Sequence, residues 1–526
     1  MGSRHLARSA GLIGAAIMTS RVLAVARETV IAYLFGAGNA MDAFTVAFRV
    51  PNLFRELFAD GAIGAALVPT FTRRLAAPGR DEAWRLGNFT LNALAAVTLA
   101  CVAAGWFLAP QLARWLAPRY ALVPGKLELT TLLTRVTLPF LTMIALAGVV
   151  TGMLNALGRF FIPALSSAVF NVAVVLSAFT LVPLMPRIGW PGIVGVAIGT
   201  VIGGAGQILL QWPFLRREGW RYAPILDTRD EGLREVMQLM APGTLGLAAV
   251  QVNVFVNTVL ATGEGTGAVS WLNYALRLMW VPIGLFGVSI GTAALPAIAR
   301  HAAASDLASL RRTVTDALRL MLMLNVPATV GLIVLARPIV SLLLERGNFG
   351  PGDTAATAAA LVCCAPGLLG YAVVKVAAPT FYALRDSRTP AIVSATSIGV
   401  NVALNLALVR VMGVNGLALG TAVAATLNGA LLVWLLRGRI GGLDGRKSAG
   451  VLARITIASL LMGLAAWAVQ HGLEIALPGP GTPVRAVRVF TSITVALGVL
   501  VGAARILHIE EFKEALARAA SRLGMS

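Results

Sequence analysis

The 526-residue chain is too apolar and too sparsely charged to be a soluble globular protein. Its mean hydropathy is +0.80 and 13% of its residues are charged, whereas a soluble domain carries about 25%. Apolar runs of about 20 residues recur along the whole chain, which predicts an all-α polytopic membrane protein. The net charge of +20 does not indicate nucleic-acid binding, because the basic residues fall in alternate loops between the apolar runs.

The apolar runs predict fourteen transmembrane helices. Their approximate bounds are 9–36, 41–72, 86–109, 130–156, 161–184, 191–215, 233–260, 268–296, 312–336, 355–382, 388–410, 414–436, 449–470 and 485–507. Arg21 interrupts the first run, so we expect an uncleaved helix and not a signal peptide. Residues 508–524 alternate apolar and charged side chains at helical spacing, which predicts a short amphipathic surface helix.

The loops predict the orientation of the chain in the membrane. One alternate set of loops and termini holds 25 Arg and Lys residues and the other set holds 8. Basic residues favour the cytoplasmic side, so we expect both termini to be cytoplasmic.

Three pairs of matching segments indicate an internal duplication. IGAALVPTFTR at 63–73 resembles IGTAALPAIAR at 290–300, at an offset of 227 residues, and the alanine–leucine and proline–alanine pairs at 156–164 recur at 383–391. GVAIGT at 195–200 resembles GLALGT at 416–421. We therefore expect two parallel six-helix lobes, 1–220 and 221–440, followed by a third part, 441–526, with spans 13 and 14 and the amphipathic tail.

The first two predicted spans carry charges that a lipid-facing helix does not tolerate. These charged residues are Arg21, Arg27, Glu28, Asp42, Arg49, Arg55, Glu56 and Asp60. A charge at the bilayer centre costs several kcal/mol unless it faces protein or water, so this cluster predicts a hydrated polar cavity.

On an ideal helix, the side chains of Asp42, Arg49, Glu56 and Asp60 fall within about 40° of one another and form a stripe. Pro51 can kink this helix and free backbone groups within the cavity. A structural alternative stays open, in which Arg49 pairs with these carboxylates.

Arg21 and Glu28, seven residues apart in the first span, share a helix face, and Arg27 is turned away from Arg21. A structural Arg21–Glu28 ion pair is the alternative to a cavity role for these two residues.

Three arginines are expected at similar membrane depths. Arg27, Arg55 and Arg277 lie within one or two turns of one level when about 1.5 Å per residue is counted from the outer ends of their spans. A guanidinium binds phosphate oxygens bidentately and keeps its charge when buried, so this set predicts an anion with several oxygens, such as a pyrophosphate.

Other intramembrane polar residues are weaker candidates. Asn253 and Asn257 share a face of span seven, and they could bind a coupling cation or hydrogen-bond a neighbouring helix. Lys375 could line the cavity or extend to the membrane surface. Catalysis is not expected, because the four histidines lie in loops or at span ends, and carboxylates interleaved with arginines make a poor metal site.

Four segments, taken together, resemble the MurJ/MviN family. They are SRVLAVARE (20–28), FGAGNAMDAFTVAFRVPNLFRELFADGAIGAALVP (35–69), SWLNYALRLMWVPIGLFGVSIGTAALP (270–296) and FYALRDSRTP (381–390). The family comprises bacterial lipid II flippases of the multidrug/oligosaccharidyl-lipid/polysaccharide exporter superfamily. The resemblance covers essentially the whole chain.

The resemblance implies a central cationic cavity between two lobes and a groove for the lipid tail at spans 13 and 14. The family's cavity arginines match Arg21, Arg27, Arg55 and Arg277, and its first-half acidic position matches Asp42.

The predicted function is therefore a lipid II flippase of the bacterial inner membrane. It would move undecaprenyl-pyrophosphate-MurNAc-pentapeptide-GlcNAc to the periplasmic leaflet by alternating access, without an enzymatic step or a cofactor. Membrane potential or a monovalent cation would couple the transport. Membrane lipids and a cell-wall synthesis complex are the further expected partners, and nucleic acid is not. A flippase for another polyprenyl-linked glycan, a cation-coupled exporter of the same superfamily and a non-transporting scaffold are the alternatives.

Overall fold

The computed structural model describes residues 3–56, 63–76, 80–225, 227, 229–443, 445–509 and 512. All regular elements in these ranges are helical, as the composition predicted. The chain divides into two compact units, Met1–Ser270 with Arg346–Phe349, and Trp271–Glu345 with Gly350–Ser526. The predicted amphipathic tail lies almost entirely outside the described residues.

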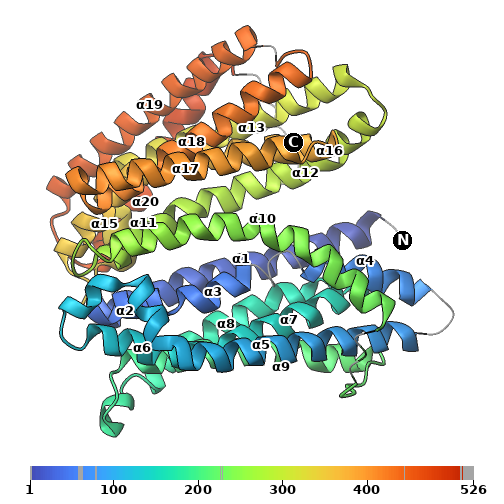
Figure 1. The fold of residues 1–526 in the computed structure, drawn as a ribbon. Coiled ribbons are helices and arrows are strands. Elements are labelled where there is room, and N and C mark those ends of the chain that lie inside the picture. Colours follow the sequence, from blue (N-terminus) through green and yellow to red (C-terminus); the bar gives the residue numbers. More distant parts are fainter. Residues whose placement is uncertain are drawn as a thin grey trace. The chain divides into compact units, whose positions relative to one another are not determined.

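The described part of the first unit contains ten α-helices. They are α1 (Ser3–Phe35), α2 (Asn39–Ala47), α3 (Arg49–Phe54), α4 (Ile63–Ala76), α5 (Asp81–Leu116), α6 (Lys126–Thr137), α7 (Pro139–Ala156), α8 (Phe161–Thr180), α9 (Ile193–Arg217) and α10 (Glu231–Ala261) (Figure 1). Their core joins α4, α5 and α7 through Phe71, Trp84 and Met153.

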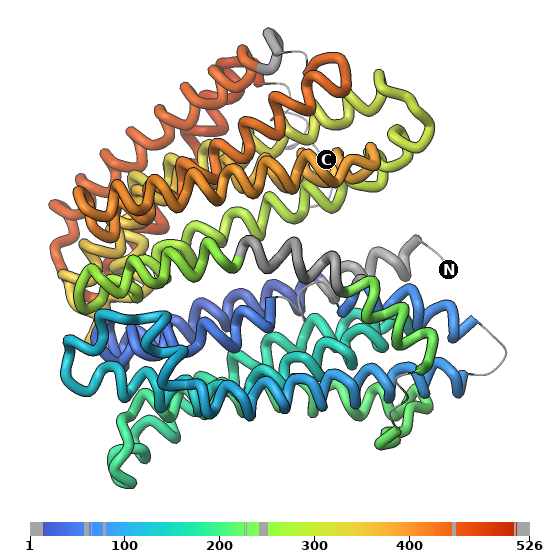
Figure 2. Tube along the Cα trace, in the orientation of Figure 1, coloured from blue at the N-terminus to red at the C-terminus, as the bar shows by residue number. Residues whose placement is uncertain are grey.

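The second unit contains the later helices, and the first turn of α11 belongs to the first unit. They are α11 (Ala268–Pro282), the π-helical turn η4 (Ile283–Gly287), α12 (Val288–Ala303), α13 (Leu307–Val334), α14 (Ala336–Leu344), α15 (Pro351–Cys364), α16 (Gly367–Ala383), α17 (Arg388–Met412), α18 (Val414–Arg439), α19 (Gly445–Ala476) and α20 (Thr482–Ile506). One core joins α12, α13, α16 and α18, and a second joins α13 to the α19–α20 hairpin. This hairpin forms the red end of the chain in Figure 2.

The helix bounds repeat at the offset that the sequence motifs indicated. Adding 227 to the bounds of α4, α6 and α7 gives 290–303, 353–364 and 366–383, and α12, α15 and α16 occupy nearly the same ranges. The cores repeat as well, because α4, α5 and α7 correspond to α12, α13 and α16. These matches support a duplicated origin, while the lobe boundaries 1–220 and 221–440 stay a prediction.

Among the described residues, ten helices are long and apolar enough to span a membrane, or eleven if the bent pair α15 and α16 counts as one span. The two charged segments at the start of the chain are not among these helices. The count of fourteen spans therefore stays a prediction.

The second predicted span, 41–72, is not one continuous helix as expected, and the stripe of charged side chains drawn on it stays a prediction. The helix breaks at Phe48, between α2 and α3. Pro51 causes this break, because it has no N–H to donate to the carbonyl of Ala47 and its ring crowds that carbonyl. Arg55 and Glu56 then lie in a π-helical turn. Asp60 lies outside the described residues.

The π-helical turn also recurs in the second unit. Position 56 corresponds to position 283 at the offset of 227, and η4 begins at Ile283. Such turns inside α-helices are rare and are frequent at functional sites. Both copies of the repeat therefore carry a π-helical turn at corresponding positions.

Glycine allows close helix packing in the second unit, between α16 and α18. A Cβ atom added at Gly370 would lie 2.2 Å from the carbonyl oxygen of Ala425, and that oxygen belongs to the backbone and cannot move aside. At Gly399, in the interior of α17, an added Cβ meets nothing within 4 Å.

We expect Gly370→Ala to destabilise the protein by about 1–3 kcal/mol, because it forces two backbones apart. Gly399→Ala is the matched control and should be neutral or stabilise by up to about 1 kcal/mol through its helix propensity. Thermal unfolding of the purified variants in detergent measures both effects. Equal melting temperatures for the two variants would contradict the packing argument.

Candidate functional site

Asp42 lies in the first turn of α2 and is completely buried. Its carboxylate forms an ion pair with Lys126, with 2.9 Å between Oδ2 and Nζ. It also accepts hydrogen bonds from the backbone N–H groups of Gly267 and Ser270 and from the Ser270 hydroxyl. The two N–H groups belong to the start of α11, where a helix N-terminus favours a negative charge. A substrate could touch Asp42 only after this arrangement opens.

Lys126 begins α6 and its side chain is also buried. Its ammonium group lies 4.1 Å from the centre of the Tyr120 ring, which adds a cation–π contact to the ion pair. In the sequence analysis, Lys126 is one of the eight basic residues in the loops on the side opposite the termini. The sequence carried no signal for its pairing with Asp42, which is 84 residues away.

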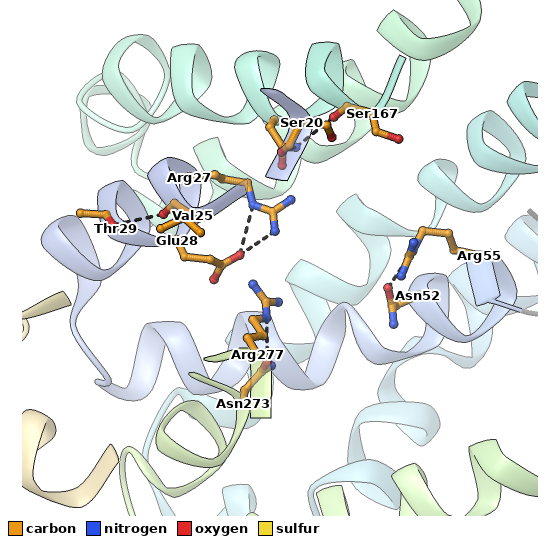
Figure 3. A network of polar contacts seen from close by, with 11 residues as sticks. Ser20, Val25, Arg27, Glu28, Thr29, Asn52, Arg55, Ser167, Asn273 and Arg277 are labelled. Carbon is orange, nitrogen blue, oxygen red and sulfur yellow. Dashed lines mark hydrogen bonds and ion pairs between the residues drawn. The ribbon is translucent and has the colours of Figure 1, made fainter. Parts of the chain in front are cut away.

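Arg27 and Glu28 form a partly buried ion pair on α1, with 2.6 Å between Nη2 and Oε1 (Figure 3). The Arg27 guanidinium also lies over the ring of Phe170 on α8, 5.4 Å from its centre. The structure pairs Glu28 with its neighbour Arg27, and the alternative pair of Arg21 with Glu28 stays a prediction. Arg21 itself is exposed on the same helix.

A second polar network surrounds the π-helical turn after α3. Asn52 Oδ1 accepts a hydrogen bond from Arg55 Nε at 3.0 Å, and Asn52 Nδ2 donates to Glu56 at 2.7 Å. The other Glu56 oxygen accepts a hydrogen bond from Gln251 on α10 at 2.6 Å. Figure 3 shows the Asn52 side chain facing Arg55. This network fixes the turn that carries Arg55 against α10.

Sequence reasoning missed Asn52 and Gln251 as members of this network. Asn52 lies three residues before Arg55 and four before Glu56, which is a spacing that brings helical side chains together, so this signal was available. No such spacing signal existed for Gln251, because it lies 195 residues from Glu56 in the sequence.

Arg277 of the second unit is oriented by its own helix. Its Nε donates to Asn273 Oδ1 at 2.8 Å, four residues earlier on α11. A neutral amide oxygen orients a guanidinium without adding an opposite charge. Asn52 contacts Arg55 in the same way, and the Arg55 guanidinium also lies 3.8 Å from a Glu56 carboxylate oxygen. The expected common depth of Arg27, Arg55 and Arg277 stays a prediction.

The remaining candidates have less defined surroundings. Arg49 on α3 is partly buried, and its Nε makes no hydrogen bond within the described part of the chain. Asn253 and Asn257 are partly buried on α10, and the Asn253 side-chain oxygen has no hydrogen-bond partner there. Lys375 is exposed on α16, whose backbone at this residue lies close to Gly291 of α12.

The chemistry of these groups is that of anion binding. Guanidinium groups donate several hydrogen bonds in a fixed fork that matches phosphate oxygens. Within the described residues, no three His, Cys, Asp or Glu side chains gather in a way that could hold a metal ion.

A family model described as "Lipid II flippase MurJ" matches residues 31–476, which is most of the chain. A protein of Vibrio cholerae serotype O1 named "Probable lipid II flippase MurJ" is 34% identical over 479 residues, which cover 88% of this chain and 88% of the relative. The chain belongs to the lipid II flippase MurJ family.

Two solved structures share the fold of this MurJ family member. "Lipid II flippase MurJ, inward closed conformation" matches with a TM-score of 0.77 at 23% identity, over 94% of this chain and 99% of the other. An inward-facing multidrug resistance MATE family transporter of the MOP superfamily matches with a TM-score of 0.70 at 16% identity, over 82% of this chain and 98% of the other. The chain therefore shares the fold of these two structures.

Proposed function

We propose that this chain is a flippase for lipid II in the bacterial inner membrane. The observation that carries the proposal is its MurJ family membership, because the family model spans residues 31–476 and the Vibrio cholerae relative matches over 88% of both chains. The abundance of apolar helices supports a multi-pass membrane location.

Arg27, Arg55 and Arg277 would bind the pyrophosphate of the substrate. Arg55 and Arg277 are oriented by hydrogen bonds to the side-chain amides of Asn52 and Asn273. The Arg55 guanidinium also lies 3.8 Å from a Glu56 carboxylate oxygen, so a phosphate at Arg55 would compete with Glu56. Arg27 is held by Glu28 and by the Phe170 ring, and a phosphate would have to compete with that carboxylate. Oriented guanidiniums favour phosphate binding because less side-chain freedom is lost when the anion arrives.

Alternating access would carry the bound headgroup across the membrane. Outward movement of net negative charge is favoured by an inside-negative potential, at about 2.3 kcal/mol per charge per 100 mV. Membrane potential could therefore drive transport, and a monovalent cation is the other candidate for coupling. The termini would be cytoplasmic, by the excess of basic residues on that side.

The alternatives differ in the chemistry of the anion site. Another polyprenyl-linked glycan would present the same pyrophosphate, whereas a cationic drug would be repelled by oriented arginines. The MATE likeness at 16% identity concerns the fold alone and does not favour drug export.

Complementation of cells depleted of their own flippase tests the proposal, together with lipid II translocation in proteoliposomes. We expect the chain to support growth and to translocate lipid II faster than an undecaprenyl-pyrophosphate carrying an unrelated glycan. Lipid II translocation no faster than in empty liposomes would refute the proposal, and equal rates for both glycans would favour the first alternative.

A further inference from the structure

A polar cavity lies in the second unit, where α14 meets the connection between α19 and α20. Its volume is about 410 Å³, within the range of about 300–1,000 Å³ that small-molecule sites occupy. The charged side chains that line it are Arg337, Glu345, Glu474, Arg485 and Arg488. No residue of the proposed pyrophosphate site contributes to this cavity.

Two of these charged side chains, Arg485 and Glu345, form an ion pair with each other. Arg485 forms a 2.9 Å ion pair with Glu345 and donates to the backbone carbonyl groups of Ser341 and Glu345. These contacts join α20 to the end of α14 and fix one side of the cavity.

The other charged side chains, Arg337, Arg488 and Glu474, have both signs and keep polar atoms that can bind a ligand. Arg488 donates through Nη2 to the carbonyl groups of Leu477 and Gly479, while its buried Nε has no hydrogen-bond partner within the described residues. Arg337 is exposed. Glu474 accepts one hydrogen bond from Gln470, through Oε1.

The cavity lies at the level where two candidate spans end. Ala449–Ala476 and Thr482–Ile506 are both apolar enough to cross a membrane, and Glu474 and Arg488 lie at their facing ends. Ile475 and Phe490 follow the lining residues Glu474 and Val489 in the sequence, and their side chains are 70% and 63% exposed. Lipid acyl chains can cover such side chains while a headgroup enters the polar cavity.

We propose that this cavity binds a phosphoethanolamine group, presented by phosphatidylethanolamine. Arg337 and Arg488 would donate to the phosphate, and the Glu474 carboxylate would accept N–H donors from the primary ammonium. An anionic headgroup without an amine would meet Glu474 as a repulsive charge. A choline headgroup would offer no N–H donor to it.

Native mass spectrometry of the purified protein tests the site, with phosphatidylethanolamine, phosphatidylcholine and phosphatidylglycerol of matched acyl chains. We expect phosphatidylethanolamine to bind best. Arg488→Gln should weaken its binding by about tenfold, the loss of one charged hydrogen bond. Glu474→Gln should weaken phosphatidylethanolamine binding and leave phosphatidylglycerol binding equal or stronger.

Arg410→Gln is the matched control, because Arg410 is exposed at the end of α17 and does not line the cavity. It should bind all three lipids as the unmodified protein does, and the melting temperature of each variant shows whether it is folded. Competition with soluble O-phosphoethanolamine distinguishes a lipid ligand from a free one, since the soluble compound should compete only weakly. Unchanged lipid preference in folded Arg488→Gln and Glu474→Gln would overturn the proposal, and tight binding of the soluble compound would overturn the lipid source.

Discussion

Replacing Arg277 by alanine should abolish growth support in flippase-depleted cells and lower lipid II binding by at least about tenfold. Truncating one partner of a buried charged contact typically costs about 2–5 kcal/mol, and 1.4 kcal/mol is a factor of ten. Asn273 orients the guanidinium of Arg277, so the alanine variant removes an oriented phosphate donor. Native mass spectrometry of lipid II complexes measures the loss of binding directly.

Arg277→Lys separates charge from geometry, because lysine keeps the charge and loses the bidentate fork. We expect weakened binding and partial growth support from this variant. Arg410→Ala, at an exposed position outside the proposed site, is the control and should behave as the unmodified chain. Full growth support by folded Arg277→Ala protein would remove Arg277 from the pyrophosphate site.

Replacing Asp42 by alanine should destabilise the first unit by about 3–5 kcal/mol, since it leaves the Lys126 charge buried without its partner. Lys126→Met should cost less, because the Asp42 carboxylate would keep the hydrogen bonds from Gly267 and Ser270. The double variant Asp42→Asn/Lys126→Met should recover part of the loss, because no buried charge remains. Thermal unfolding in detergent gives the order of the three variants.

The ion pair between Arg159 and Glu218 is the matched comparison, because its arginine is 63% exposed. Exposed pairs contribute about 0–1 kcal/mol, so Arg159→Gln should be nearly neutral. A destabilisation by Lys126→Met no larger than that of Arg159→Gln would show that the buried pair does not hold α2, α6 and the start of α11 together.

The sequence by itself determined the membrane class, the helical fold and the duplication. Long apolar segments must form helices in a bilayer, because the backbone of each segment must satisfy its own hydrogen bonds there. The repeat of short motifs at 63–73 and 290–300 then located α4 and α12 as equivalent helices. The arginines within apolar runs also stood out as candidates, since charge in an apolar run is rare and costly.

Only the tertiary structure decided which partner each charge has. Helical periodicity reports which residues share a face of one helix, and it says nothing about the neighbouring helix. It therefore could not predict the pairing of Asp42 with Lys126, or of Glu56 with Gln251, from residues 84 and 195 positions apart. The single helix expected over 41–72 was wrong, because the helix is divided at Phe48, three residues before Pro51.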